Sequence, residues 1–257
     1  MLDQLKKRVR EKLVHVVEDA VRRQNEELHR QVRELNEQVA GLELRDRRDM
    51  FAAAEREAVT SSAAYVGQHF SGATWHPHPH ETLRAALAAA PTGGMALEFG
   101  VFSGTTLRII ARERRGEVYG FDVFSGLPED WRPGFPAGTF EVEDLPKVAC
   151  AELVVGLFED TLPGFLAEHD GPIDLLHVDC DLYSGAVTVL ELAGDRLRPG
   201  SIVIFDEYLN HQNWQQGEFK AWAEHVARTG ISYEYVAYTF DHEQVVVRVT
   251  DVPSNPA

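Results

Sequence analysis

Residues 97–108 read LEFGVFSGTTLR and contain the most informative local pattern of the chain. It begins as a short apolar strand, turns at Gly100 and Gly104, and continues into helix-forming residues. Glycines spaced four apart let the chain turn tightly and bring backbone N–H groups against a ligand at a helix N-terminus. The spacing differs from the GxGxxG of dinucleotide-binding enzymes. We therefore predict a strand, a ligand-binding turn and a helix.

The chain beyond residue 95 repeats this pattern of a short apolar run, a turn and a helical stretch. The predicted strands are residues 95–99, 118–121, 151–155, 173–178, 201–205, 233–238 and 244–249. Strands that alternate with helices imply parallel βαβ units with helices on both faces of a sheet. This indicates an α/β fold with a doubly wound, Rossmann-like, seven-stranded and mostly parallel sheet whose last strand is antiparallel. Residues 134–143, GFPAGTFEVE, predict a loop over the site.

The N-terminal segment has a different composition. Residues 1–57 contain no proline and one glycine, which favours helix. The seam residues are spaced four and three apart, as in a coiled coil: Leu28, Val32, Leu35, Val39 and Leu42. Asn25 falls at an a position of the same frame and fits a parallel pair. We predict two parts, a helical coiled-coil segment at 1–57 and a catalytic domain at 58–257, and a homo-oligomer formed through the helix. A single amphipathic helix lying on its own domain is the alternative.

Composition limits the partners and the compartment. The formal net charge is −16, which disfavours nucleic acid as a substrate. No apolar run is long enough to span a membrane and the N-terminus lacks the apolar core of a secretory signal, so we expect no integral membrane segment and a cytoplasmic protein. The two cysteines, Cys150 and Cys180, are predicted to lie in the core.

Acidic and aromatic residues after the second and third strands suggest a nucleoside cofactor. Asp122 ends the strand that follows the glycine turn, where Rossmann-like folds place the acid that binds ribose hydroxyls. Phe158 and Asp160 follow the third strand and are candidates for the face and the amine of adenine. Asp122 and Asp160 could instead cap helices. The predicted cofactor-binding residues are Glu98, Gly100, Ser103, Gly104, Thr105, Asp122, Phe158 and Asp160.

Carboxylates follow the fourth and fifth strands. Asp179 ends one of these strands, and Asp206 and Glu207 end the other. The carboxyl ends of adjacent central strands border the crevice where open α/β sheets bind ligands. Oxygen ligands of this kind suit Mg²⁺, and without a cation or a bound proton the three acids would repel one another. We predict Asp179, Asp206 and Glu207 as metal ligands, with helix caps or solvated loop acids as the alternative.

Five ordered motifs carry a family resemblance. LEFGVFSGTTLR, GFDVFSGLPEDW, GLFEDTLP, HVDCDLYSG and IVIFDEY resemble the TylF/macrocin O-methyltransferases over roughly residues 61–249. The resemblance implies methyl transfer from S-adenosylmethionine to a sugar hydroxyl of a natural product or a glycan, with Mg²⁺ as a second cofactor. It implies that Asp179 is a catalytic metal ligand and that Asp181 is the general base. Glu207 stands where the family usually has Asp, and the N-terminal coiled coil is outside the family pattern.

Two other functions remain open from the residues alone. A nicotinamide-dependent oxidoreductase would share the fold and the ribose-binding acid, but the GxGxxG spacing is missing. A non-catalytic coiled-coil scaffold with a degenerate domain would bind no cofactor, and the intact glycine turn argues against it. The expected acceptor is a small molecule or a glycan.

Overall fold

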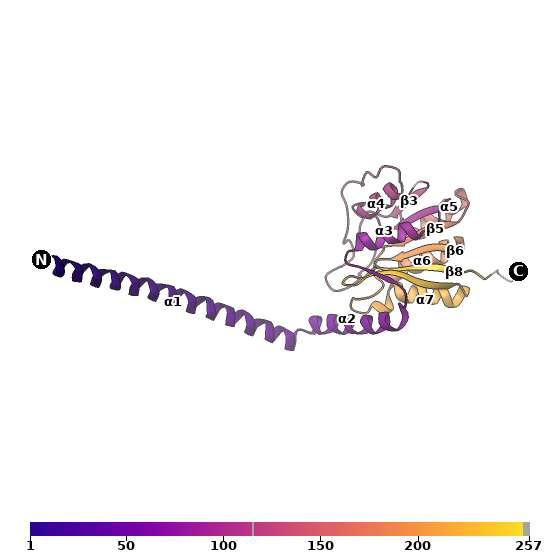
Figure 1. The fold of residues 1–257 in the computed structure, drawn as a ribbon. Helices are drawn as coiled ribbons and strands as arrows, with labels where there is room; N and C mark the ends of the chain where they lie inside the picture. The colour runs from indigo at the N-terminus through magenta and orange to yellow at the C-terminus, as the bar shows by residue number, and fades with distance from the viewer. Residues whose placement is uncertain (115, 254–257) are drawn as a thin grey trace. The chain divides into compact units, whose positions relative to one another are not determined.

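The computed structural model describes residues 1–114 and 116–253 of the chain (Figure 1). The chain divides into two compact units, Met1–Ala54 and Glu55–Ala257. Among the described residues, no helix combines the length and the apolar character that a membrane crossing requires.

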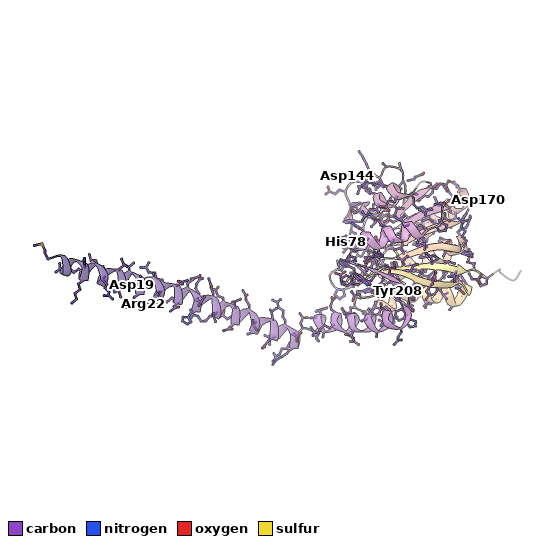
Figure 2. All side chains as sticks on the ribbon, viewed as in Figure 1. Asp19, Arg22, His78, Asp144, Asp170 and Tyr208 are labelled. Carbon is purple, nitrogen blue, oxygen red and sulfur yellow. The ribbon has the colours of Figure 1, made fainter. Side chains whose placement is uncertain are left out.

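The first unit consists largely of one helix, α1 (Leu2–Arg48). Figure 2 shows its side chains, among them Asp19 and Arg22, around a single helical rod. Arg30 stabilises the helix surface by ion pairs with Glu27 at 2.6 Å and Glu34 at 3.2 Å. The five seam residues Leu28 to Leu42 are 46–62% exposed, so the predicted apolar seam exists and is uncovered in the single chain.

The predicted helical segment at residues 1–57 contains a break between two helices. The first helix ends at Asp49, whose backbone is extended, and α2 (Met50–His69) begins one residue later. The Asp49 carboxylate accepts hydrogen bonds from the backbone N–H groups of Phe51 at 3.0 Å and Ala52 at 3.1 Å. Asp49 therefore caps the second helix, which gives a physical reason for a break without glycine or proline.

The second unit is built on a sheet of eight strands. The strands are β1 (Thr74–His76), β2 (Met95–Phe99), β3 (Val118–Asp122), β4 (Glu152–Val155), β5 (Ile173–Val178), β6 (Leu197–Phe205), β7 (Ser232–Thr239) and β8 (Val245–Asp251). Their order in the sheet is β1-β7-β8-β6-β5-β2-β3-β4. The seven predicted strands are all present. The eighth, β1, is a three-residue edge strand that is too short to give a hydrophobic pattern.

The pairing explains where a ligand can bind. Strand β8 is antiparallel to β6 and β7, as predicted, and the other pairs are parallel. Strand β2 pairs with both β3 and β5, so the chain order reverses on either side of it. Open α/β sheets bind ligands at the carboxyl ends of the strands beside such a switch point.

Helices cover both faces of this sheet (Figure 1). The remaining helices are α3 (Pro79–Ala89), α4 (Thr105–Glu113), α5 (Phe158–Glu168), α6 (Tyr183–Ala193) and α7 (Glu218–Thr229), with 3₁₀ turns at Gly194–Arg196 and Trp214–Gln216. Leu97 and Phe99 of β2 pack with α5, α6 and α7, whereas Ala96 packs with α3 and α4. This alternation is the period-two pattern of a strand that is buried on both faces.

Residues 123–151 connect β3 and β4 without a helix or strand and form a loop with its own backbone hydrogen bonds. Leu127 N donates to Thr139 O at 2.8 Å, Gly138 N donates to Leu127 O at 2.9 Å, and Val142 N donates to Phe124 O at 3.1 Å. Cys150 at the end of this loop is exposed, so its predicted burial is wrong. Cys180 is buried, as predicted.

Candidate active site

The glycine turn joins β2 to α4 and lies directly against the end of β5. Gly100 has a φ of +94°, and a Cβ atom there would lie 1.6 Å from the backbone oxygen of Asp179. Glycine is therefore required at this position for two reasons, the left-handed backbone and the close approach. Gly104 has a φ of +74°, precedes α4 and packs against Pro146 and Val148 of the loop.

Asp122 organises this turn from the end of β3. One carboxylate oxygen, Oδ2, accepts the backbone N–H groups of Val101 and Phe102, each at 2.8 Å, and Oδ1 accepts that of Phe124 at 2.7 Å. Asp122 also lines the pocket beside the turn. It does not cap a helix, and its carboxylate can still accept further hydrogen bonds because each oxygen has two lone pairs.

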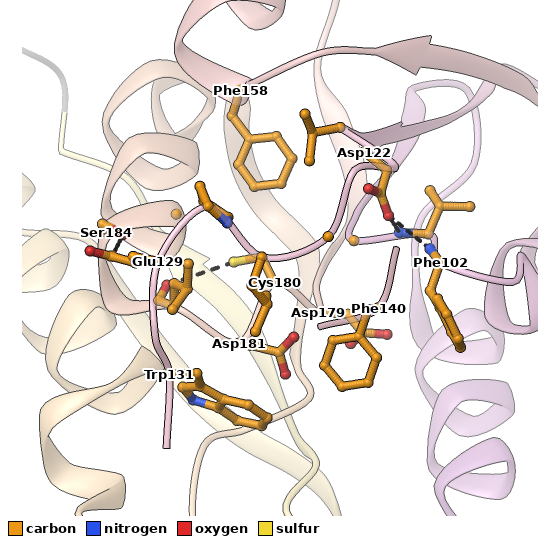
Figure 3. Close-up of a pocket in the computed structure, with 18 of the residues that line it drawn as sticks. Phe102, Asp122, Glu129, Trp131, Phe140, Phe158, Asp179, Cys180, Asp181 and Ser184 are labelled. Atoms are coloured by element: carbon orange, nitrogen blue, oxygen red, sulfur yellow. Dashed lines mark hydrogen bonds between the residues drawn. The ribbon is translucent and has the colours of Figure 1, made fainter. Parts of the chain in front are cut away.

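The pocket has a volume of about 720 Å³ and follows the carboxyl ends of the strands (Figure 3). The predicted cofactor residues that line it are Gly100, Ser103, Thr105, Asp122 and Phe158. Glu98, Gly104 and Asp160 do not line it, and Asp160 is exposed in the first turn of α5. Its neighbour Glu159 lines the pocket instead.

Three acids converge at one point of the site, as the sequence predicted. Carboxylate oxygens of Asp179, Asp206 and Glu207 lie within 4.8 Å of one another. Glu207 is only 7% exposed, and its Oε2 has no hydrogen-bond partner. Burial and the nearby charge of Asp206 raise the pKa values of Asp179 and Glu207 well above the usual range. A bound cation would remove this repulsion.

A buried histidine connects this acid cluster to the glycine turn. His177 on β5 lies with Nε2 3.6 Å from Asp206 Oδ1 and with Nδ1 3.3 Å from Glu98 Oε1. Burial disfavours the imidazolium, but the two carboxylates raise the pKa of His177 well above its usual value. Burial also opposes ionisation of Asp206, yet His177 and Gln244 keep its pKa below the usual range. Asp206 is therefore the ionised member of the cluster.

Glu98 serves this buried network rather than the pocket surface. It is fully buried and accepts a short hydrogen bond from the hydroxyl of Thr106, which does line the pocket. Glu98 therefore does not line the pocket itself but positions Thr106, which does.

Asp181 lies beside the acid cluster and faces the pocket (Figure 3). Its backbone is left-handed, with a φ of +64°. Burial, followed by the nearby charge of Asp206, raises its pKa to about 7. At neutral pH such a carboxylate is about half ionised and can accept a proton.

Sequence reasoning did not identify several residues of this site. Glu218 at the start of α7 is fully buried and accepts the backbone N–H of Glu207 at 2.9 Å. Trp131, Arg132, Phe135 and Phe140 of the loop line the pocket. The loop was predicted over the site, but only its turn composition was available, and turn composition does not say which side chains face inward.

The comparisons with known proteins are in agreement with this geometry. A family model described as a methyltransferase domain matches residues 97–208. A search of curated proteins gave no match. Among solved structures, CalS11, a calicheamicin methyltransferase, is 25% identical, covers 66% of this chain and 76% of its own, and has a TM-score of 0.51. The O-methyltransferase NovP is 24% identical, covers 66% of this chain and 78% of its own, and also has a TM-score of 0.51.

The domain match contains the glycine turn, Asp122, Asp179 and Asp181, and Asp206 and Glu207 lie near its end. It favours methyl transfer over the oxidoreductase and scaffold alternatives. These findings confirm the resemblance to the TylF/macrocin enzymes, and the chain contains a methyltransferase domain within a Rossmann-like fold.

Proposed function

We propose that the chain methylates a hydroxyl of a sugar or a related diol, in a natural product or a glycan, with the help of Mg²⁺. The observation that carries this proposal is the convergence of Asp179, Asp206 and Glu207 within 4.8 Å, beside Asp181 in the same pocket as the glycine turn. A site that methylates a reactive thiol or amine would not need such a cluster to activate its acceptor.

The donor set fits a hard divalent cation. All three residues offer carboxylate oxygens, and one buried oxygen of Glu207 has no other partner. Asp179, Asp206 and Glu207 would hold Mg²⁺, which supplies Lewis acidity that lowers the pKa of an alcohol. Two adjacent hydroxyl groups suit such a site because both can be ligands.

The chain's own residues then have distinct roles. Bound S-adenosylmethionine supplies an electrophilic methyl group. Asp122 holds the turn at Val101 and Phe102 in place for the cofactor, and Phe158 offers an aromatic face near the start of α5. Asp181 accepts the proton of the acceptor hydroxyl. The loop at residues 123–151 limits the access of water to the pocket.

Calorimetry with S-adenosylhomocysteine, with and without Mg²⁺, tests the cofactor part of this proposal. Transfer of labelled methyl groups to a panel of sugars and catechols, with and without a chelator, tests the metal and acceptor parts. We expect transfer that requires Mg²⁺. Asp179→Asn should weaken Mg²⁺ binding and be partly rescued by excess metal. Full activity in a thoroughly chelated sample would contradict the role of the metal.

We also propose that α1 self-associates through the seam Leu28 to Leu42. The seam is 46–62% exposed in the single chain, and its frame places Asn25 at an a position. Leu35→Asp should lower the oligomeric state in light scattering. The matched control is Leu44→Asp, because Leu44 is equally exposed, at 57%, but lies off the seam. An unchanged mass for Leu35→Asp would contradict the proposal.

A further inference from the structure

We propose that the acceptor is an electrically neutral molecule that carries an apolar or aromatic group next to its hydroxyls, and that nucleotide-linked sugars are excluded. This inference rests on the proposed function and narrows its acceptor class. Three features of the pocket carry it: its charge, the pairing of its arginine and its aromatic lining.

Acidic side chains outnumber basic ones in the lining of the pocket. Six carboxylates line it, namely Asp122, Glu129, Glu159, Asp179, Asp181 and Glu207. Among the lining residues, all of which the structure describes, Arg132 is the one Lys or Arg side chain. A magnesium ion and the cofactor sulfonium would offset part of this charge, but they lie at the reacting hydroxyl. A diphosphate farther out would face acidic residues in a partly enclosed space, where charges repel more strongly than in open water.

Arg132 already has a carboxylate partner, which offsets its charge toward a phosphate. Its Nη1 atom lies 3.1 Å from Glu243 Oε1 and 3.2 Å from Oε2. Its guanidinium carbon lies 3.8 Å from the ring centroid of Trp131. Arg132 and Glu243 are both about three-quarters buried, which makes the pair less accessible to salt than an exposed pair. A phosphate at the guanidinium would therefore lie close to the Glu243 carboxylate, whose negative charge opposes its binding.

Aromatic rings form a continuous surface at the same end of the pocket. Trp131 contacts Phe135 at 5.1 Å between ring centroids, Phe135 contacts Phe140 at 5.8 Å, and Phe140 contacts Phe102 at 5.4 Å. Phe102 is 45% exposed although it lines the pocket. In Figure 3, Trp131 and Phe140 lie near Asp181 and Asp179, away from Phe158.

These rings therefore border the part of the pocket beside Asp181, where we expect the acceptor, rather than the part beside Phe158, where we expect adenine. Exposed apolar surface inside a cleft is typical of a ligand site, and aromatic rings pack on other rings or on the apolar faces of sugars. The surface suits an aryl glycoside or the hydrophobic body of a glycosylated natural product.

The test compares matched forms of the same sugar. Glucose, galactose and rhamnose are each supplied as the p-nitrophenyl glycoside and as the nucleoside-diphosphate sugar, and their binding to the full chain saturated with S-adenosylhomocysteine and Mg²⁺ is measured by calorimetry. We expect at least one aryl glycoside to bind at least tenfold more tightly than its nucleotide form. A nucleotide form that binds as tightly, or no binding of any aryl glycoside, would overturn the inference.

Two variants locate the effect. Trp131→Ala should weaken the aryl glycoside at least tenfold, with substantial rescue by Trp131→Phe and unchanged binding of S-adenosylhomocysteine. Glu243→Gln frees Arg132 and should raise the affinity for the nucleotide form about threefold to tenfold. The matched control is Glu234→Gln, which breaks a 2.8 Å ion pair with Arg248 away from the pocket and should change neither affinity. No response to Trp131→Ala would also overturn the inference.

Failure of this inference differs from failure of the proposed function. If S-adenosylhomocysteine does not bind, or no hydroxyl compound is methylated, the proposed function is wrong. If nucleotide-linked sugars are methylated in a Mg²⁺-dependent reaction and bind best, the proposed function holds and only the neutral acceptor is wrong.

Discussion

The carboxylates at the two ends of the pocket have opposite environments. At the glycine turn, Asp122 accepts three backbone N–H groups at 2.7–2.8 Å. At the acid end, Asp179, Asp206 and Glu207 crowd within 4.8 Å, and Glu207 retains a buried oxygen without a partner. The first end is complete without a ligand, because the chain itself supplies the donors. At the second end His177 offsets the charge of Asp206, but the buried Oε2 of Glu207 has no donor.

The two ends of the pocket therefore differ in whether their stability depends on a bound ligand. The turn holds its shape before the cofactor arrives, so binding there costs little reorganisation. The acid end stores repulsion that a bound cation relieves, so its stability depends on what is bound. Substitutions at the two ends should therefore have different signatures.

The largest loss of cofactor binding and of stability should come from Gly100→Ala, because Gly100 lies where the glycine turn contacts the acid end of the pocket. The new Cβ would overlap the backbone oxygen of Asp179, at 1.6 Å, and alanine would be strained at a φ of +94°. We expect loss of S-adenosylhomocysteine binding and a fall in melting temperature. Gly93→Ala is the matched control, since Gly93 has a φ of +109° and open space around its Cβ position. Equal effects of the two substitutions would show that backbone strain alone matters.

Asp181→Asn should reduce kcat by about 10²–10⁴, the usual contribution of a general base, with metal and cofactor binding retained. Asparagine suits the test because it tolerates the left-handed backbone of Asp181. Burial raises the pKa of Asp181 to about 7 in the metal-free protein, and a bound cation lowers it again, so wild-type activity with Mg²⁺ should fall at a pH below 7, where the base becomes protonated. The pH profile of kcat, taken with saturating Mg²⁺, checks this. A variant with near-normal kcat would rule out Asp181 as the base.

Asp122→Ala should weaken S-adenosylhomocysteine binding by about 1–3 kcal/mol, because the N–H groups of Val101 and Phe102 lose their acceptor. Calorimetry measures this directly. Asp130→Ala is the control: Asp130 also accepts a backbone N–H, that of Ala137 at 2.8 Å, but does not line the pocket. Unchanged affinity in a folded Asp122 variant would remove the residue from the cofactor site.

Glu207→Gln should give the smallest effect of the four substitutions, and it should raise the stability of the metal-free protein rather than lower it. Burial raises the pKa of Glu207, so the metal-free folded state binds this proton more tightly than the unfolded chain, and stability falls as the pH rises above the ordinary value of 4.5. Removing the charge should raise the melting temperature of chelated protein at neutral pH by about 2–4 °C, corresponding to about 1 kcal/mol. The variant should also lose the stabilisation by Mg²⁺.

Exposed Glu191→Gln on α6 should change neither property. If Glu207→Gln is less stable than wild type in chelator, the Glu207 carboxylate stabilises the metal-free fold, and the prediction of repulsion is wrong. Glu207→Asp, the residue usual in similar enzymes, tests whether a shorter arm binds Mg²⁺ more tightly.

The sequence was sufficient for the seven main strands because strands buried on both faces are continuous apolar runs with clear turns between them. It also placed Asp179, Asp206 and Glu207 together, because the carboxyl ends of parallel strands meet at one edge of the sheet. The roles of these residues as ligands and of Asp181 as the base stay predictions, as do those of the cofactor residues.

Other features depended on contacts that no local pattern contains. The burial of Glu98 follows from its pairing with His177 on a neighbouring strand, and Glu218 reaches Glu207 from a helix eleven residues later. The break at Asp49 depends on a single side-chain cap. Cys150 sits among apolar residues in sequence but ends an exposed loop.

The loop between β3 and β4 has a consequence for the evolution of acceptor choice. Its shape is held by backbone hydrogen bonds such as those between Leu127 and Thr139, and by the close approach of Gly126 to Gly138. These bonds do not depend on the identity of the side chains that face the pocket. Trp131, Phe135 and Phe140 can therefore be exchanged while the loop keeps its path. A new acceptor can be acquired, in nature or in a designed library, by changing these three positions and leaving the strands that carry the chemistry untouched.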